Sequence, residues 1–297
     1  MIKPLISIAL CTFNGERFLK EQLDSLVNQT YLNIEIIVVD DLSSDGTLKI
    51  LQNYAAQYKS INIYKNEVNL GYIKNFEKAI GLCSGDFIAL ADQDDIWELE
   101  KIDLLFSNIG NNTLIYHDSE FVDDKGNTLH KKLSDRLNMY EGNSPYPFFF
   151  YNCISGHSMM FKKSLIAAIL PLNDKYYHDW QIAITATLNG GIKYLDQPLV
   201  KYRQHELSST DFLKIKRKKA KKNSLTNRDW LKYVQTKLGN DLYLAEIISC
   251  LNDDNEVKEG YKIKLFQALL KNATLLFYMK KKHSFFKMFK AFKISFF

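Results

Sequence analysis

Residues 34–47 read IEIIVVDDLSSDGT and contain the clearest structural pattern of the chain. Its first six residues are nearly all apolar, which is typical of a strand buried on both faces of a parallel sheet. The sequence turns polar at Asp40 and Asp41, and Ser44 or Asp45 is placed to cap a following helix. The stretch therefore predicts a buried strand, a polar turn and a helix.

The same alternation of strand and helix extends in both directions. The predicted strands are 5–10, 34–39, 61–64, 87–90 and 158–161, and the predicted helices in this part are 16–27, 45–58, 73–83 and 178–188. This order predicts an α/β fold with a mostly parallel central sheet and helices on both faces. Between residues 111 and 147 the pattern is weak and polar, so we expect this segment to form the rim of a site.

The charge of the chain is unevenly distributed. Of 297 residues, 46% are hydrophobic and 25% charged, a composition that excludes wholesale disorder. Residues 1–210 hold 19 Lys/Arg and 26 Asp/Glu, whereas residues 211–297 hold 20 and 8. We therefore predict a catalytic domain over 1–210 and a helical basic region over 211–297, the latter attracted to an anionic surface.

The sequence also bears on the cellular compartment. The four cysteines form no CxxC pair, which favours free thiols in a reducing compartment. No signal peptide and no run of about 20 apolar residues is present, so we expect a cytoplasmic chain that does not cross a membrane.

An acidic cluster, Asp92-Gln93-Asp94-Asp95, follows the predicted strand 87–90. In open parallel sheets, ligands bind beyond the carboxyl ends of the strands. Carboxylates on alternate residues can share a hard cation such as Mg²⁺ or Mn²⁺ together with substrate phosphates. The alternative is a helix start with acidic residues in its first turn, a role that suits Asp95 in particular.

Two further polar loops are expected at the same edge of the sheet. Thr12 and Asn14 follow the first strand, and Asp40 and Asp41 follow the second. A carboxylate there can accept a hydrogen bond from a base N–H or a ribose hydroxyl. Turns with helix caps would account for the same residues, so both interpretations stay open for these loops.

Four segments in this order resemble family 2 glycosyltransferases: residues 7–15 (SIALCTFNG), 36–47 (IIVVDDLSSDGT), 69–71 (NLG) and 92–97 (DQDDIW). The resemblance covers roughly residues 4–205. It implies an inverting enzyme with the A-type nucleotide-sugar transferase (GT-A) fold. The DQDDIW variant looks most like the bacterial rhamnosyltransferase-like branch that builds surface polysaccharides.

The resemblance implies roles for individual residues. Asp179, in a His-Asp pair where the family usually has Glu-Asp, takes the place of the catalytic base. The other implied roles are nucleotide binding for Thr12, Asn14, Asp40, Asp41 and Asp92, metal binding for Asp92, Asp94 and His205, and an acceptor-side loop for Asn152 and Gly156. From the residues alone, Asp179 could equally be a helix cap and His205 a surface histidine.

The expected reaction is transfer of a sugar from a UDP-hexose or dTDP-rhamnose donor to a hydroxyl of a glycan or lipid-linked glycan. A divalent cation, Mn²⁺ or Mg²⁺, would meet the charge of the leaving diphosphate. The P-loop and the GxGxxG dinucleotide motif are both missing. The remaining alternative is a non-catalytic relative that binds a nucleotide sugar or glycan.

The basic C-terminal region carries two further features. Phe285, Met288, Phe289, Phe292 and Phe296 share one predicted helical face, with lysines away from it. This pattern is typical of a helix lying on an anionic membrane, although a helix packed on the core would give it too. The basic run 214–222 comes without a nucleic-acid-binding motif, so we expect no nucleic-acid partner.

Overall fold

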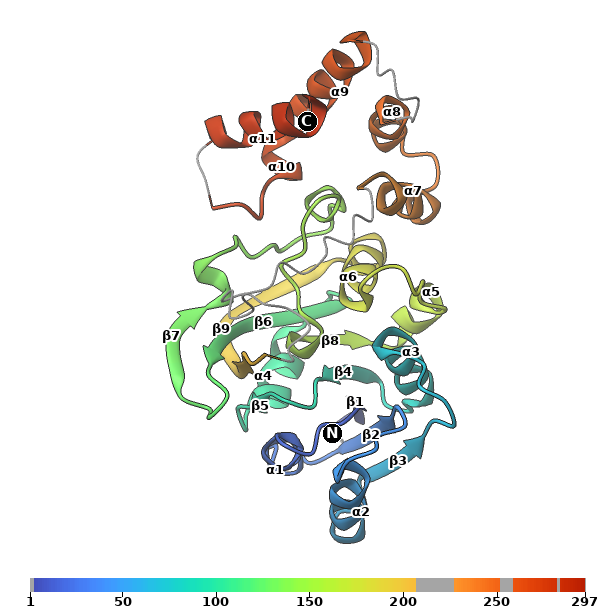
Figure 1. Ribbon diagram of the computed structural model, residues 1–297, viewed down its shortest axis with the longest axis vertical. Coiled ribbons are helices and arrows are strands. Elements are labelled where there is room, and N and C mark those ends of the chain that lie inside the picture. Colours follow the sequence, from blue (N-terminus) through green and yellow to red (C-terminus); the bar gives the residue numbers. More distant parts are fainter. Residues whose placement is uncertain (1–2, 207–226, 252–258, 282–283, 297) are drawn as a thin grey trace.

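A computed structural model describes residues 3–206, 227–251, 259–281 and 284–296 (Figure 1). The predicted boundary near residue 210 and the basic run 214–222 lie outside the described residues.

The first half of the described chain forms a parallel sheet. Its strands lie in the order β3-β2-β1-β4, and every neighbouring pair is parallel. In register, Ile8 of β1 lies opposite Ile36 of β2 on one side and Ala89 of β4 on the other. These strands are β1 (Ile6–Thr12), β2 (Ile34–Asp40), β3 (Ile61–Lys65) and β4 (Phe87–Ala91). The carboxyl ends of β1, β2 and β4 therefore meet at one edge, as predicted.

The second half extends the same sheet with strands of mixed direction. Antiparallel β8 lies between β4 and β6, and β6 in turn pairs in parallel with β9. Two short strands complete it, β5 antiparallel to β9 and β7 antiparallel to β6. The bounds are β5 (Ile96–Trp97), β6 (Leu114–Val122), β7 (Thr128–Lys132), β8 (Met159–Lys162) and β9 (Ile192–Arg203).

The expectation that residues 111–147 form only a polar rim is wrong for β6, which is a buried strand within the sheet. Its polar residues have partners inside the protein that sequence patterning does not reveal. Asp118 accepts hydrogen bonds from the N–H and hydroxyl of Ser134, at 3.0 and 2.6 Å. Ser119 Oγ lies 2.9 Å from Nε2 of His157. Buried polar groups paired in this way are compatible with a central strand.

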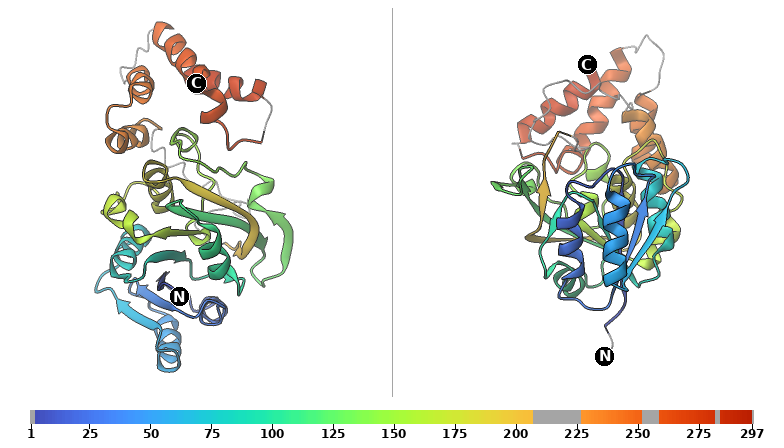
Figure 2. Two further views of the ribbon diagram at one scale, coloured as in Figure 1. Left: turned by 180° about the vertical axis from the view of Figure 1, so that it is seen from behind. Right: turned by 60° about the horizontal axis from the view of Figure 1, so that its bottom comes forward.

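Helices cover both faces of the sheet (Figures 1 and 2). On one face of the sheet, Ile36 and Val38 of β2 share a hydrophobic cluster with α1 (Leu19–Val27), α2 (Thr47–Gln57) and α4 (Lys101–Asn108). On the opposite face, Ile37 and Val39 share a second cluster with α3 (Tyr72–Leu82) and α6 (His178–Leu188). This alternation of side chains confirms the predicted α/β layering.

The C-terminal region is helical. Within the described residues it comprises α7 (Asn227–Leu238), α8 (Leu242–Cys250), α9 (Glu259–Lys271), α10 (Ala273–Leu276) and α11 (Ser284–Phe296). Gly239, with φ 66°, ends α7, so the chain turns before α8. In the described ranges, no helix is both long and apolar enough to cross a bilayer.

One carbonyl joins the C-terminal helices to the α/β part. The indole N–H of Trp180, on α6, and that of Trp230, on α7, both donate to the backbone oxygen of Phe148, at 2.7 and 3.3 Å. Phe148, Trp230 and Phe277 belong to the same hydrophobic cluster as β4 and β6. The C-terminal helices therefore share a core with the sheet.

Candidate active site

The loops after β1 and β2 are held together by hydrogen bonds. Thr12 Oγ1 donates to Asp40 Oδ1 at 2.9 Å, and the N–H of Ser43 donates to Asp40 Oδ2 at 2.9 Å. Asn14 Oδ1 accepts from the N–H of Ser44, also at 2.9 Å. Three predicted nucleotide-site residues thus lie together. Asp40 is fully buried, so its carboxylate stabilises these two loops from within the protein.

Asp41 fixes the next loop. Its carboxylate accepts hydrogen bonds from the N–H groups of Leu70 and Gly71 at 2.8 and 2.9 Å, and from the Asn66 side chain at 2.8 Å. Gly71 has φ 79°, a conformation that favours glycine, and α3 starts at the following residue. Asp41 thereby joins the end of β2 to the start of α3.

Gln93 connects the loop after β4 to the loop after β1. Its amide accepts from the N–H of Phe13 at 2.8 Å and donates to the carbonyl of the same residue at 3.0 Å. Gly15 lies directly beneath, where a Cβ would come within 2.3 Å of Gln93 Oε1. These two hydrogen bonds, the Gln93 clamp, join the loops after β1 and β4, and a Cβ at position 15 would displace the Gln93 amide.

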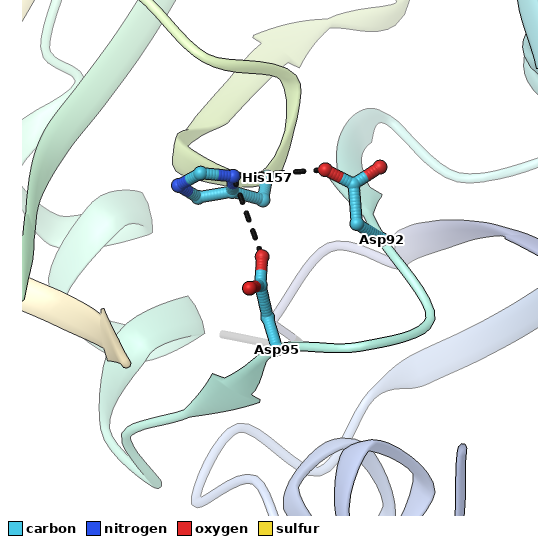
Figure 3. A group of neighbouring side chains, drawn as sticks. All are labelled: Asp92, Asp95 and His157. Atoms are coloured by element: carbon cyan, nitrogen blue, oxygen red, sulfur yellow. Dashed lines mark ion pairs between the residues drawn. The ribbon is translucent and has the colours of Figure 1, made fainter. Parts of the chain in front are cut away.

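The acidic loop contacts a buried histidine (Figure 3). Nδ1 of His157 lies 3.3 Å from Asp95 Oδ2 and 3.6 Å from Asp92 Oδ2. Burial and the negative charges of Asp94 and Asp92 raise the pKa of Asp95 well above its ordinary value. Burial also pushes the pKa of Asp92 upward, but its interaction with His157 outweighs this and the pKa is lowered. Asp92 therefore ionises more readily than Asp95.

Asp94 pairs with His205, which the family resemblance predicts to bind the metal. His205 Nε2 lies 2.8 Å from Asp94 Oδ2. The end of β9 sets this pairing, because the N–H of Arg203 donates to Asp95 Oδ1 at 3.0 Å and its Nε donates to the carbonyl oxygen of Asp94 at 2.9 Å. Two residues beyond Arg203, the chain reaches His205.

These residues fit a divalent cation. Within the described part of the chain, Asp92, Asp95 and His157 offer ligand atoms within 4.8 Å of one another. Asp95 is fully buried, whereas the side chains of Asp92 and Asp94 are 37% and 22% exposed. A cation that also binds substrate phosphates needs such an open side. Of this group, Asp92 is the member with an open side, whereas the predicted ligands Asp94 and His205 pair with each other and lie outside the group.

Asp179 lies in the first turn of α6. Burial raises its pKa to about 7, and the negative charge of Asp92 adds to the rise. The N–H of Trp180, the Asn152 side chain and the N–H of Gly156 act in the opposite direction. The structure thus brings Asp179 together with both predicted acceptor-side residues. A carboxylate with a pKa near 7 is well matched to proton transfer at neutral pH.

His178 occupies the position next to Asp179. Its ring stacks on Phe76, with centroids 4.2 Å apart and planes at 18°. A Cβ on Gly156 would come within 2.7 Å of His178 Nε2, so the loop approaches this ring closely. Burial lowers the pKa of His178 to about 4, so it adds no charge beside Asp179 at neutral pH.

The match to known proteins covers most of the chain. The model of the family described as "Glycosyl transferase family 2" matches residues 7–170. The chain belongs to glycosyl transferase family 2. The dTDP-rhamnosyl transferase RfbG of Shigella flexneri is 30% identical over 274 residues, which are 88% of this chain and 92% of that protein. An uncharacterized glycosyltransferase of Haemophilus influenzae is 26% identical over 90% of this chain and 87% of its own length.

Solved structures agree on the fold of this glycosyltransferase. S. aureus TarS 1-349, in complex with UDP-GlcNAc, superposes with a TM-score of 0.61 at 17% identity, covering 92% of this chain and 82% of that one. The mannosyltransferase PcManGT from Pyrobaculum calidifontis, in complex with GDP-Man and Mn²⁺, gives 0.51 at 14% identity, covering 98% and 74%. The enzyme has the expected GT-A fold.

Two contributors to the site of this family 2 enzyme, His157 and Lys101, were assigned no role from the sequence. Nζ of the fully buried Lys101 donates to the carbonyl oxygen of His157 at 2.6 Å and lies 3.2 Å from the Trp97 ring centroid. Lys101 lies four positions after Trp97 of the DQDDIW segment and belongs to no recognisable motif. Its role depends on burial, which the sequence pattern did not reveal.

Proposed function

We propose that this glycosyltransferase is an inverting, metal-dependent enzyme that transfers a sugar from a UDP-hexose or dTDP-rhamnose donor to a hydroxyl of a glycan or lipid-linked glycan. The observation that carries the proposal is the position of Asp179. Its carboxyl, with a pKa near 7, lies beside Asn152 and Gly156 and within electrostatic reach of Asp92. The candidate base Asp179 is thus close to the acidic loop, residues 92–95, that we assign to the donor.

On the donor side, the loops with Thr12, Asn14, Asp40 and Asp41 form the wall for the nucleoside. Asp92, Asp94 and His205 would hold the divalent cation, which when bound neutralises the diphosphate of the donor. The Gln93 clamp keeps these two parts of the site in register. Without a cation, the neighbouring carboxylates of the acidic loop would repel one another, so the cluster favours cation binding.

On the acceptor side, Asp179 takes the proton of the attacking hydroxyl. The hydroxyl oxygen forms a bond to the anomeric carbon while the bond from that carbon to the diphosphate oxygen breaks. Attack and departure on opposite faces invert the anomeric configuration. The electron pair of the broken bond leaves on the nucleoside diphosphate, so charge and atoms balance in one displacement.

The rhamnosyl relative favours a role in bacterial surface polysaccharide synthesis, such as that of capsule or O-antigen. A lipid-linked acceptor would place the reaction at the cytoplasmic face of the plasma membrane, with the enzyme bound peripherally. The basic C-terminal region is consistent with this location, because an anionic membrane attracts it.

Thermal unfolding with UDP, dTDP, GDP or CMP, with and without Mn²⁺, tests the donor side. A ligand present at a hundredfold excess over its Kd stabilises by about 2.7 kcal/mol, and we expect this only for UDP or dTDP with metal present. Asp179→Asn should keep this binding and lose transfer. Binding by the wild type without turnover on any offered acceptor would favour the non-catalytic alternative.

A further inference from the structure

The last helix presents an exposed apolar face. Ala291 and Ser295 of α11 are buried, at 0% and 7% exposure, whereas Met288, Phe289 and Phe292 are 47%, 53% and 39% exposed. The Phe289 and Phe292 rings lie 6.5 Å apart at 27°, so the aromatic surface is continuous. Ile294 also packs against the core, and Phe292 meets the ring of Phe266 on α9 with centroids 5.9 Å apart. Met288, Phe289 and Phe292 nevertheless keep much of their apolar surface exposed.

The apolar surface continues beyond the helix itself. A cavity of about 330 Å³ opens beside Met288, between α9, α10 and α11, and is lined by Leu270, Ala273, Thr274, Lys287 and Met288. Leu275 of α10 is 38% exposed. Contiguous apolar surface of this kind on a folded domain marks an interaction site.

The segment that carries this face is strongly basic. Residues 259–297 contain nine lysines and a single acidic residue, Glu259. Lys281 is exposed beside α11, and Lys287 and Lys290 are partly exposed on the helix. Exposed aromatic residues flanked by lysines match the chemistry of an anionic bilayer, with its acyl region and its negative headgroups.

The same region contacts the acceptor side of the site. Phe277, which follows α10, stacks on Phe150 with ring centroids 5.8 Å apart. Lys280 Nζ lies 4.4 Å from the ring centroid of Tyr151. The next residue is Asn152, which interacts with Asp179. The C-terminal helices are thus connected to the acceptor loop through a few packed side chains.

We propose that α11 lies in the surface of an anionic phospholipid bilayer, with Met288, Phe289 and Phe292 in the acyl boundary and the lysines at the headgroups. This inference rests on the proposed function in one respect: a lipid-linked acceptor explains why the enzyme would bind a membrane. The helices that pack on Phe150 and Tyr151 would then lie at the membrane that holds such an acceptor.

Co-sedimentation of the full chain with vesicles tests the proposal. We expect binding to vesicles of phosphatidylglycerol and phosphatidylcholine, little binding to phosphatidylcholine alone, and weaker binding at high salt. The variant Met288→Ser/Phe289→Ser/Phe292→Ser should lose about tenfold or more of this binding, because apolar insertion supplies much of the affinity. Lys281→Glu/Lys287→Glu should weaken it by removing the attraction to the headgroups.

The matched control is Leu32→Ser/Val68→Ser/Leu242→Ser, which replaces three other apolar residues that are 87%, 61% and 84% exposed. It should bind vesicles as the wild type does. Equal binding by the α11 triple variant, or equal binding to neutral vesicles, would overturn the proposal. A wild-type dimer that the triple variant makes monomeric, without vesicle binding by either, would assign the face to a second copy instead.

The assay contains no sugar, donor or acceptor, so its result is independent of the transfer reaction. Nucleotide-dependent thermal stabilisation of the triple variant should equal that of the wild type. This second measurement separates a failed membrane interaction from a failed glycosyltransferase assignment and also reports that the variant is folded.

Discussion

Nδ1 of His157 lies 3.3 Å from Oδ2 of Asp95, and both side chains are almost completely removed from solvent. Ser119 Oγ, 2.9 Å from Nε2, fixes the other side of the ring. The same Nδ1 lies 3.6 Å from the more exposed Asp92. The buried His157 thus orients Asp92, a candidate cation ligand. A residue that supports a metal ligand in this way fixes the geometry of that ligand.

Replacing His157 should therefore weaken cation binding. Loss of a residue that orients a metal ligand costs about 10- to 100-fold in metal affinity, and we expect His157→Gln to fall in this range. Mn²⁺ binding measured by calorimetry in the presence of the stabilising nucleotide reports the effect without turnover. Ser119→Ala, which removes only the bond to Nε2, should give a smaller loss in the same direction.

His117→Gln is the control for this prediction. His117 is equally buried and its Nδ1 contacts the carbonyl oxygen of Asp118. Its replacement should lower the free energy of unfolding yet leave the Mn²⁺ affinity of the folded protein unchanged. Equal losses of affinity in both variants would assign His157 a merely structural role.

The pKa of Asp179, near 7, predicts the pH dependence of transfer. The base must be ionised, so kcat/KM should rise with pH up to about 7 and level off above it. Rates measured from pH 5 to pH 9 at saturating Mn²⁺ test this. A profile that is flat between pH 5 and pH 8 would contradict the assignment of Asp179 as the base.

The same group affects stability in the opposite sense. Because its folded-state pKa lies above the unfolded value, the folded state binds more protons between about pH 4 and pH 7, and ionisation destabilises it as the pH rises. Asp179→Asn should thus have a higher Tm than the wild type at pH 8, and the difference should shrink toward pH 4. Asp174→Asn, at an exposed carboxylate nearby, should show no such trend.

Gly156→Ala should disturb the acceptor side. The added Cβ would come within 2.7 Å of His178 Nε2, and that ring is stacked on Phe76 and has little freedom to move. Overpacking of this kind costs about 1–3 kcal/mol of stability. Gly156→Ala/His178→Ala should recover part of the loss in urea unfolding, because the smaller side chain makes room. Strictly additive losses would mean that the two residues do not meet.

Trp230→Ala should destabilise the whole protein, because Trp230 is buried in the cluster that α7 shares with the sheet. Removal of a large buried aromatic side chain costs about 3–5 kcal/mol. Unfolding in urea should show one transition with a lower midpoint. Lys232→Ala, at an exposed position on the same helix, should change the unfolding free energy by less than about 0.5 kcal/mol.

Strand ends were predictable from the sequence, and long-range partners were not. The apolar run before Asp40 is a local pattern, and the carboxyl ends of parallel strands must meet, so the convergence of the polar loops followed from periodicity. The roles of His157 and Lys101 depend on burial and on contacts between segments 56 or more positions apart. The polar β6 strand was missed for the same reason, since its partners lie on other elements.

The shared carbonyl of Phe148 has an optical consequence. Of the three tryptophans in the chain, two meet there, with ring centroids of Trp180 and Trp230 only 4.7 Å apart. The third, Trp97, lies under the ammonium group of Lys101. The enzyme therefore carries a pair of adjacent tryptophan chromophores where α6 meets α7 of the C-terminal region. Its ultraviolet emission and near-ultraviolet dichroism should register any movement between these two helices, including one caused by lipid.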